Sequence, residues 1–253
     1  MGVATVLSGL MTELLSIKGV SKSYRRGERR LQVLRDVSLA VHEAEIVAVM
    51  SNRFEGKSTL LQIAAGIEEP DEGTVCLDGQ RLCDLRVGER EQLRPGVIAW
   101  ASRAGSGIDL RVLDHLALPL LLAGHSPPEA EEIAGAMLAR VEAPDIGRLH
   151  WSELSNWERL LVSLARGLVR SPRLLVLDDL LDGLGLAKTE RASDLLRSLV
   201  AERRCGVLLS VSDVDAALAA DRIYTFEKGR LSLLAGAGEV LEFPHRGRRR
   251  ADG

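Results

Sequence analysis

The sequence predicts an α/β fold in which a doubly wound parallel sheet is preceded by an antiparallel β subdomain and interrupted by an inserted helical subdomain. Three observations support this prediction. The apolar run IVAVM at residues 46–50 leads through a polar loop into an amphipathic helix that opens with GKST. Alternating apolar and polar residues, typical of antiparallel strands, precede that run. After residue 172, apolar strands alternate with helical patterns, which is typical of parallel sheets.

The β-rich opening consists of two predicted strands, residues 13–17 and 32–42, joined by a basic loop at residues 25–30. Tyr24 stands at the end of the first segment. Beyond the GKST helix, PDEG at residues 70–73 predicts a turn before a strand at 74–77, and Asp78-Gly79 predicts another turn. These elements are expected to frame the polar loop.

The rest of the chain predicts an inserted helical lobe at about residues 103–164 and then the remainder of the core. A strand at 97–100 and a flexible loop at 104–107 precede the lobe, and Ser126 with the prolines after it marks a helix start. Helices are predicted at 112–122, 128–141, 157–169, 188–202 and 214–220, and strands at 173–179, 206–211, 223–226 and 230–234.

The strand–loop–helix at residues 45–66 has the pattern of a phosphate-binding P-loop. In such a loop backbone N–H groups surround the phosphates, a lysine reaches the β and γ oxygens, and a hydroxyl holds Mg²⁺, roles that fit Lys57 and Ser58. The first glycine of G-x-x-x-x-G-K-[ST] is replaced by Ser51, and the interior reads NRFE. A chance GKST in an ordinary loop is the alternative reading.

Glu55 suggests why this loop would bind phosphate poorly. Its carboxylate lies two residues before Lys57. We expect it to accept hydrogen bonds from Lys57 and nearby N–H groups in the space of a β-phosphate. The alternative is a Glu55 that faces solvent and a loop that still admits ATP.

Composition narrows the class of protein. The 253 residues are 46% apolar, and the formal net charge of −3 predicts no nucleic-acid partner. Three cysteines without metal spacing favour a reducing compartment. The longest apolar stretch is too short to span a bilayer, and the first ten residues lack the basic start of a signal peptide. A cytoplasmic protein is expected, with an N-terminal extension at 1–12, one domain at 13–243 and a basic tail at 244–253. The sequence leaves open whether translation starts at Met1 or Met11.

Asp178 ends an apolar strand downstream of the P-loop, where a Mg²⁺-binding Walker B aspartate belongs. LSNWE at residues 154–158 lies one helix upstream. With GVSKSY, VLDHLALPL, LARGLVRSPRLLVLDD and ADRIYTFEKGRL, the chain resembles the nucleotide-binding domain of ABC transporters, a P-loop NTPase, over residues 14–234. The resemblance is nearest to the group that serves macrolide export, lipoprotein release and cell division.

The resemblance implies ATP and Mg²⁺ as cofactors. It places Tyr24 as the aromatic residue that stacks on adenine and Ser58 with Asp178 as the metal site. The residues that it implies for nucleotide binding are Tyr24, Ser51, Glu55, Gly56, Lys57, Ser58, Thr59 and Ser155.

Several family positions carry other residues here. The glutamine that senses Mg²⁺ is replaced by Ser102, the general-base glutamate by Asp179, and the switch histidine by Ser212. The aspartate of the dimer loop is replaced by Gly185, and the LSGGQ signature reads LSNWE. Asp179 withdraws its carboxylate by one methylene, a misplacement that can cost about 100-fold in rate. We therefore expect hydrolysis to be weak or absent.

The resemblance also implies partners. A membrane permease on another chain is expected to contact residues 102–120, with this protein on the inner face of the cell membrane. Because both half-sites are altered, a second, motif-complete nucleotide-binding chain is expected beside it. Two alternatives are an active ATPase with divergent motifs and a regulatory or scaffolding protein that transports nothing.

Overall fold

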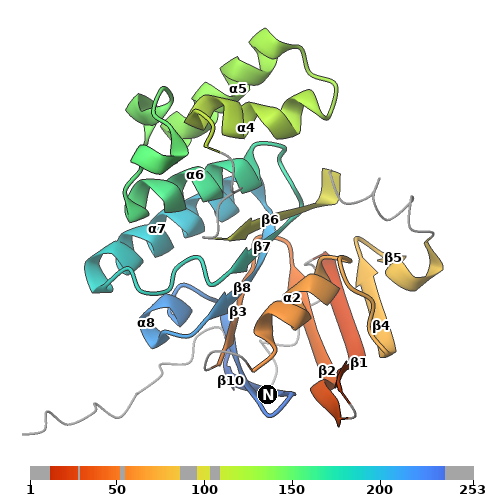
Figure 1. The fold of residues 1–253 in the computed structure, drawn as a ribbon. Coiled ribbons are helices and arrows are strands. Elements are labelled where there is room, and N and C mark those ends of the chain that lie inside the picture. The colour runs from red at the N-terminus through yellow and green to blue at the C-terminus, as the bar shows by residue number, and fades with distance from the viewer. Residues whose placement is uncertain (1–11, 28, 52–54, 86–95, 103–108, 237–253) are drawn as a thin grey trace, which may run out of the picture.

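The computed structural model describes residues 12–27, 29–51, 55–85, 96–102 and 109–236, and two sheets organise them. The larger sheet has six strands in the order β10-β9-β3-β8-β7-β6, and the smaller has the order β2-β1-β4-β5 (Figure 1). In the larger sheet all neighbours are parallel except the pair β9–β10. The predicted α/β fold with an antiparallel β subdomain is confirmed.

The strands are β1 (Glu13–Arg26), β2 (Arg29–His42), β3 (Ile46–Met50), β4 (Glu72–Leu77), β5 (Gln80–Arg81), β6 (Ile98–Ser102), β7 (Leu174–Asp178), β8 (Gly206–Val211), β9 (Arg222–Glu227) and β10 (Arg230–Ala235). The α-helices are α2 (Lys57–Ala64), α4 (Val112–Leu121), α5 (Pro127–Arg140), α6 (Asn156–Leu168), α7 (Leu186–Arg203) and α8 (Val214–Ala217). Short 3₁₀ turns lie at Leu82–Asp84, Pro144–Ile146 and Trp151–Glu153.

The predicted elements are present, and their ends differ in places. β1 continues to Arg26 and β2 begins at Arg29, so Arg25 pairs with Arg30 and Arg26 with Arg29 in a β1–β2 hairpin where the sequence predicted a basic loop. Tyr24 lies inside β1 opposite Leu31. Asp179 falls just outside β7 with a φ of 47°. Ser126 is the N-cap of α5, although its side chain makes no capping hydrogen bond. The predicted flexible loop at 104–107, the N-terminal extension to residue 11 and the basic tail lie outside the described residues.

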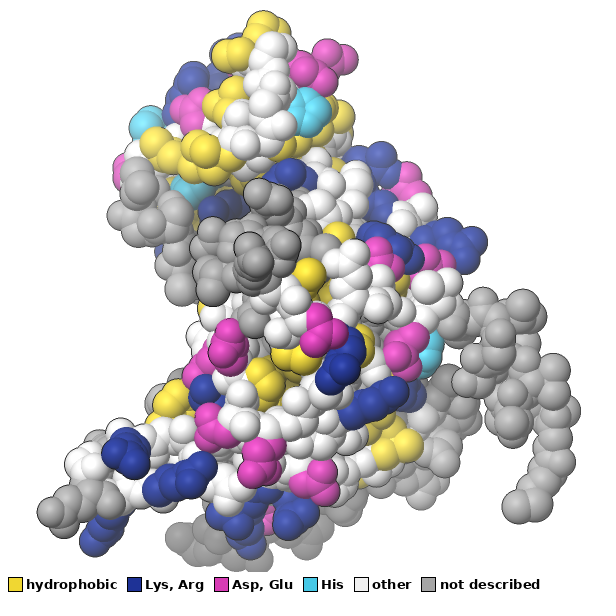
Figure 2. Space-filling view, turned by 90° about the vertical axis from the view of Figure 1, so that its right-hand side faces the viewer, with side chains coloured by type: hydrophobic (Ala, Val, Ile, Leu, Met, Phe, Trp, Pro, Cys, Tyr) yellow, Lys and Arg dark blue, Asp and Glu magenta, His cyan; other side chains and the backbone are white. Residues whose placement is uncertain are grey.

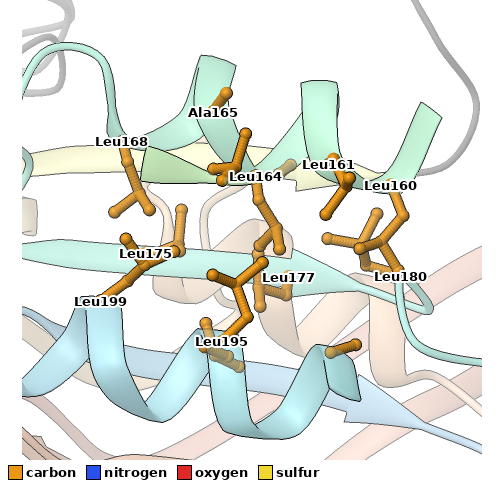
Figure 3. Packing of buried hydrophobic residues seen from close by; sticks show 14 of the residues in the cluster. Leu160, Leu161, Leu164, Ala165, Leu168, Leu175, Leu177, Leu180, Leu195 and Leu199 are labelled. Atoms are coloured by element: carbon orange, nitrogen blue, oxygen red, sulfur yellow. The ribbon is translucent and has the colours of Figure 1, made fainter. Parts of the chain in front are cut away.

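The central strands of the larger sheet are continuous apolar runs because both faces of the sheet are buried. Alternate residues of β3, β7 and β8 join the cluster formed with α4, α5, α6 and α7, and the others join the cluster formed with α2 and the smaller sheet. In β7, Leu175 and Leu177 face α6 and α7 (Figure 3). The sheet is thereby fixed between two apolar layers, which hold its carboxyl edge in place.

An ion pair joins the two sheets. The guanidinium of Arg222 on β9 donates to both carboxylate oxygens of Glu45, at 2.5 and 3.0 Å, and to the carbonyl oxygen of Ala40 at the end of β2. The backbone N–H of His42 also donates to Glu45, at 2.8 Å. Burial alone would raise the pKa of Glu45, but these hydrogen bonds outweigh it and hold the pKa below its usual value of 4.5.

Helices α4 and α5 pack against each other at one end of the molecule, over α6 (Figure 1). Figure 2 shows hydrophobic side chains gathered at this end of the surface. Leu118 and Leu121 of α4 are 40% exposed and Leu122 is 80% exposed. Within the described residues, no helix is long and apolar enough to cross a membrane.

Candidate nucleotide site

The candidate site lies at the carboxyl edge of the larger sheet. The parallel register pairs Met50 with Val211 and Asp178 with Ser210, so β3, β7 and β8 end at the same level. The loop after β3 leads into α2, whose N-cap Gly56 has a φ of 111°. A Cβ at Gly56 would lie 2.5 Å from Val33 Cγ1, so a glycine is required there. In open α/β sheets this edge is where ligands bind.

Lys57 is buried, only 5% exposed, at the start of α2. Its Nζ donates to the carbonyl oxygens of Ser51 at 3.1 Å and Val211 at 2.8 Å, and to Ser212 Oγ at 2.6 Å. It lies 3.3 Å from Asp179 Oδ1. The ammonium is therefore turned toward the ends of β3, β7 and β8.

The expected pairing of Glu55 with Lys57 is wrong. Among the described residues, the carboxylate beside Lys57 Nζ is that of Asp179, and Glu55 is half-buried in the loop. The reason is the register of the sheet. β7 ends beside β8, so Asp179 reaches the ammonium across the site, and proximity in sequence does not decide the pairing.

Ser58 and Asp178 form the oxygen pair that Mg²⁺ would need. Ser58 Oγ donates to Asp178 Oδ1 at 3.3 Å across the site. Mg²⁺ is usually held by one or two protein oxygens together with waters and substrate phosphates. A hydroxyl and a carboxylate this close to the end of the phosphate loop fit that ion. The sequence-predicted pair is thus brought together.

Asp178 and Asp179 share the hydroxyl of Ser210. Ser210 Oγ lies 2.8 Å from Asp178 Oδ1 and 3.0 Å from Asp179 Oδ1, and it accepts a hydrogen bond from the backbone N–H of Asp179 at 2.9 Å. Sequence reasoning missed Ser210. The signal was a polar residue inside the buried strand GVLLSV.

Ser212 follows β8, where its hydroxyl accepts from Lys57. Its backbone N–H donates to both carboxylate oxygens of Asp182, at 3.0 and 3.1 Å. Asp182 is 8% exposed and was also missed. An aspartate in the otherwise apolar loop LLDGLG was the available signal. Asp182 therefore fixes the backbone of Ser212 at the end of β8.

Tyr24 is 37% exposed near the start of α2. Its hydroxyl donates to Glu68 Oε2 at 2.6 Å and lies 3.4 Å from Thr59 Oγ1. Burial and the hydrogen bond to Glu68 raise its pKa. The ammonium of Lys22 lies 5.7 Å from the ring centroid. An aromatic side chain thus stands near α2 with its hydroxyl anchored.

Ser155 caps α6 away from these residues. Its Oγ accepts from the N–H of Glu158 at 3.3 Å, and its own N–H donates to Glu158 Oε2 at 2.8 Å, a capping box. Hydrogen bonding from the hydroxyl and the N–H of Ser155 to the carboxylate holds the pKa of Glu158 below its usual value. Trp157 packs against the core, and the guanidinium carbon of Arg191 lies 5.4 Å from its ring centroid. The start of α6 is therefore capped by Ser155 and carries the carboxylate of Glu158.

Ser102 ends β6 and pairs with Asp178 in the parallel register. Its carbonyl oxygen accepts from Ser163 Oγ of α6 at 3.4 Å. Gly185 is the N-cap of α7, with a φ of 78°. The hydrogen bonds and ion pair described above bring seven residues together at one edge of the sheet: Ser51, Lys57, Ser58, Asp178, Asp179, Asp182 and Ser212. Ser102 lies beside them at the end of β6.

These features define a P-loop nucleotide-binding protein: a strand, a phosphate-type loop, a helix that begins with Lys57 and Ser58, and an aspartate that ends β7, the second strand along in the same sheet. Residues 34–181 match the family model described as ABC transporter. The chain belongs to the ABC transporter ATP-binding family.

Three similar proteins illustrate the match. The lipoprotein-releasing system ATP-binding protein LolD of Pseudomonas syringae pv. tomato is 33% identical over 86% of this chain and 96% of its own. The methionine import ATP-binding protein MetN of Latilactobacillus sakei is 30% identical over 91% of this chain and 67% of its own. The ATP-binding cassette MJ0796, solved as a dimer in a post-hydrolysis state with ADP and Pi, superposes with a TM-score of 0.80 at 27% identity, covering 88% of this chain and 100% of that one.

Proposed function

We propose that this chain is the nucleotide-binding subunit of an exporter-type membrane transporter in which its own ATP hydrolysis is weak or absent. It would act on the inner, cytoplasmic face of the cell membrane beside a permease and a second, motif-complete nucleotide-binding chain. The names of the LolD relatives, which belong to lipoprotein-releasing systems, support the transporter class.

The observation that carries the proposal is that groups expected to face phosphate already bind carboxylates of this chain. Asp179 lies beside Lys57 Nζ at 3.3 Å. Glu158 accepts from the N–H of Ser155 at 2.8 Å, so the start of α6 is also engaged. A nucleotide would have to compete with both contacts.

The hydrolytic step would lack its usual groups. A Mg²⁺ ion held by Ser58 and Asp178 would neutralise charge on the β and γ oxygens of ATP. Asp179, at the general-base position, is bonded to Ser210 and paired with Lys57, so its carboxylate is not free to orient a water. Ser212 offers a hydroxyl where an imidazole would contact the γ-phosphate. These residues support nucleotide binding more than turnover.

The permease contact is proposed on residues 102–120, of which the structure describes 102 and 109–120. Asp109 accepts from the N–H of Ser152 at 2.9 Å and from its hydroxyl at 3.0 Å, so this carboxylate holds the turn before α6. Asp114 is 44% exposed and pairs with Arg111 on its own helix. Because exposed pairs contribute little stability, Asp114 can be changed without unfolding the lobe.

Co-purification from native membranes tests the partnership. The tagged wild-type chain is expected to recover one polytopic membrane protein, and Asp114→Lys should reduce that recovery about tenfold, a loss of about 1.4 kcal/mol of binding. Asp194→Lys is the matched control, because Asp194 is exposed on α7 outside the proposed contact. Recovery that is equal for the two variants would place docking elsewhere, and recovery of no polytopic protein would favour a scaffold.

A further inference from the structure

Lys57 is enclosed by oxygen atoms of its own chain. Ser51 O, Val211 O and Ser212 Oγ accept hydrogen bonds from Nζ at 2.6–3.1 Å, and Asp179 Oδ1 lies 3.3 Å away. An ammonium group has three N–H donors, so four neighbouring oxygens already saturate it. A phosphate oxygen can therefore be bound only if one of these four oxygens gives up its place.

Asp179 is the partner that can move. The carbonyl oxygen of Val211 lies at the end of β8, which the sheet holds, and Ser51, just after β3, donates its N–H to that same oxygen at 3.2 Å. Ser212 is fixed through its N–H by Asp182. Asp179 lies outside β7 in the left-handed region, with a φ of 47°, and its side chain is 44% exposed. Among the described residues, Asp179 is also the partner of Lys57 Nζ that carries the negative charge a phosphate would replace.

Ser210 holds Asp179 in this position. It is 1% exposed, and a hydroxyl buried in an apolar strand is costly unless it is bonded. Its oxygen accepts from the N–H of Asp179 at 2.9 Å, and it lies 3.0 Å from Oδ1 of the same residue. The backbone of Asp179 is thus tied to Ser210, whose single hydroxyl proton is shared between the carboxylates of Asp178 and Asp179.

The charges of the described site residues also disfavour phosphate binding while Asp179 is in place. Asp178, Asp179 and Asp182 meet at this edge with one described ammonium, that of Lys57. Without a metal ion these groups sum to about −2, which repels a polyphosphate. Removing the charge of Asp179 would both free Lys57 and lower this repulsion.

We propose that Asp179 holds Lys57 in the place of a nucleotide phosphate, that Ser210 is the residue positioning Asp179, and that Mg-ATP enters only by displacing this carboxylate. The proposal rests on the proposed function and names the regulation of the same site. While nucleotide is absent, the carboxylate of Asp179 therefore occupies the place beside Lys57 Nζ that a phosphate would take.

Calorimetric titration of the full chain with Mg-ATP tests the contact. Asp179→Asn should bind at least about tenfold more tightly than the wild type. Asp213→Asn is the charge-matched control. Asp213 caps α8 beside Ser212 but does not touch Lys57, and asparagine caps a helix equally well. Binding by Asp179→Asn that is no tighter than binding by Asp213→Asn would overturn the proposal.

Two further variants test the role of Ser210. Ser210→Ala should strengthen Mg-ATP binding, because Asp179 loses its support, and Ser210→Thr, which keeps the hydroxyl, should restore the wild-type affinity. A general loss of structure would weaken binding in both variants. Ser210→Ala that binds no more tightly than Ser210→Thr would reject the positioning role.

The reactivity of Lys57 supplies a measurement that does not need nucleotide. Acetic anhydride labelling followed by mass spectrometry should modify Lys57 faster in Asp179→Asn than in wild type or Asp213→Asn. If none of the proteins binds Mg-ATP, an unchanged labelling rate overturns the proposal. Turnover of ATP by the wild type would instead reject the proposed weak hydrolysis, whatever Asp179→Asn does.

Discussion

The purified chain is expected to remain monomeric when Mg-ATP is added. In the family, each nucleotide is held between the phosphate loop of one subunit and the signature helix of the other. Here Glu158 places a carboxylate at the start of α6, the helix at the signature position, where it accepts from the N–H of Ser155. A carboxylate at that helix start also repels a phosphate.

Sedimentation velocity measures this directly. The wild-type chain should show the same sedimentation coefficient with and without Mg-ATP. The matched variant carries Asn156→Gly, Trp157→Gly and Glu158→Gln, which recreate LSGGQ, together with Asp179→Asn. It should shift toward dimer, because both half-sites are then open. A nucleotide-dependent dimer of the wild type would contradict the assignment of two closed half-sites.

Replacing Arg222, whose guanidinium links the larger sheet to β2, is expected to lower the free energy of unfolding strongly. Arg222→Ala removes the guanidinium from the carboxylate of Glu45, 9% exposed, and leaves it the ring nitrogen Nδ1 of His42 at 2.9 Å. Removing one partner of a buried pair costs about 3–5 kcal/mol, and we expect the lower end because Arg222 retains some exposure. Arg230→Ala, on the exposed side of β10, should shift the free energy of unfolding by under about 0.5 kcal/mol.

The same pair predicts a pH dependence. The pKa of Glu45 is lower in the folded chain than its usual 4.5, so its contribution to stability is complete above that value. It is then lost progressively as the pH falls through the depressed folded pKa. Denaturant titrations of wild type and Glu45→Gln between neutral and acid pH should therefore converge at acid pH. Parallel curves would show that the pair does not shift the pKa of Glu45.

Most of the fold could be predicted because the central strands are buried on both faces and read as uninterrupted apolar runs. The end of β1 could not, because its outer residues are polar and pair only with β2. Lys57, Ser58 and Asp178 were found from their motif spacing. The partner of Lys57 was predicted wrongly, since neighbours in sequence suggested Glu55 whereas the strand register brings Asp179.

Ser210 and Asp182 illustrate what spacing does not reveal. Each is a polar residue within an apolar stretch. This pattern predicts that the side chain is buried and hydrogen-bonded, but it does not identify the partner. Only the pairing of β7 with β8 shows that Ser210 reaches two aspartates. Only the path of the loop after β7 brings Asp182 to the N–H of Ser212. Residues that act across strands need the register before their roles can be assigned.

Steady-state phosphate release from Mg-ATP tests the central claim, that ATP hydrolysis at this site is weak or absent. The wild-type rate should equal that of Asp178→Asn, which removes the carboxylate proposed to hold Mg²⁺ while keeping the shape of the side chain. It should also be unchanged by chelating Mg²⁺. A magnesium-dependent rate in the wild type that Asp178→Asn abolishes would show an active ATPase and contradict this account.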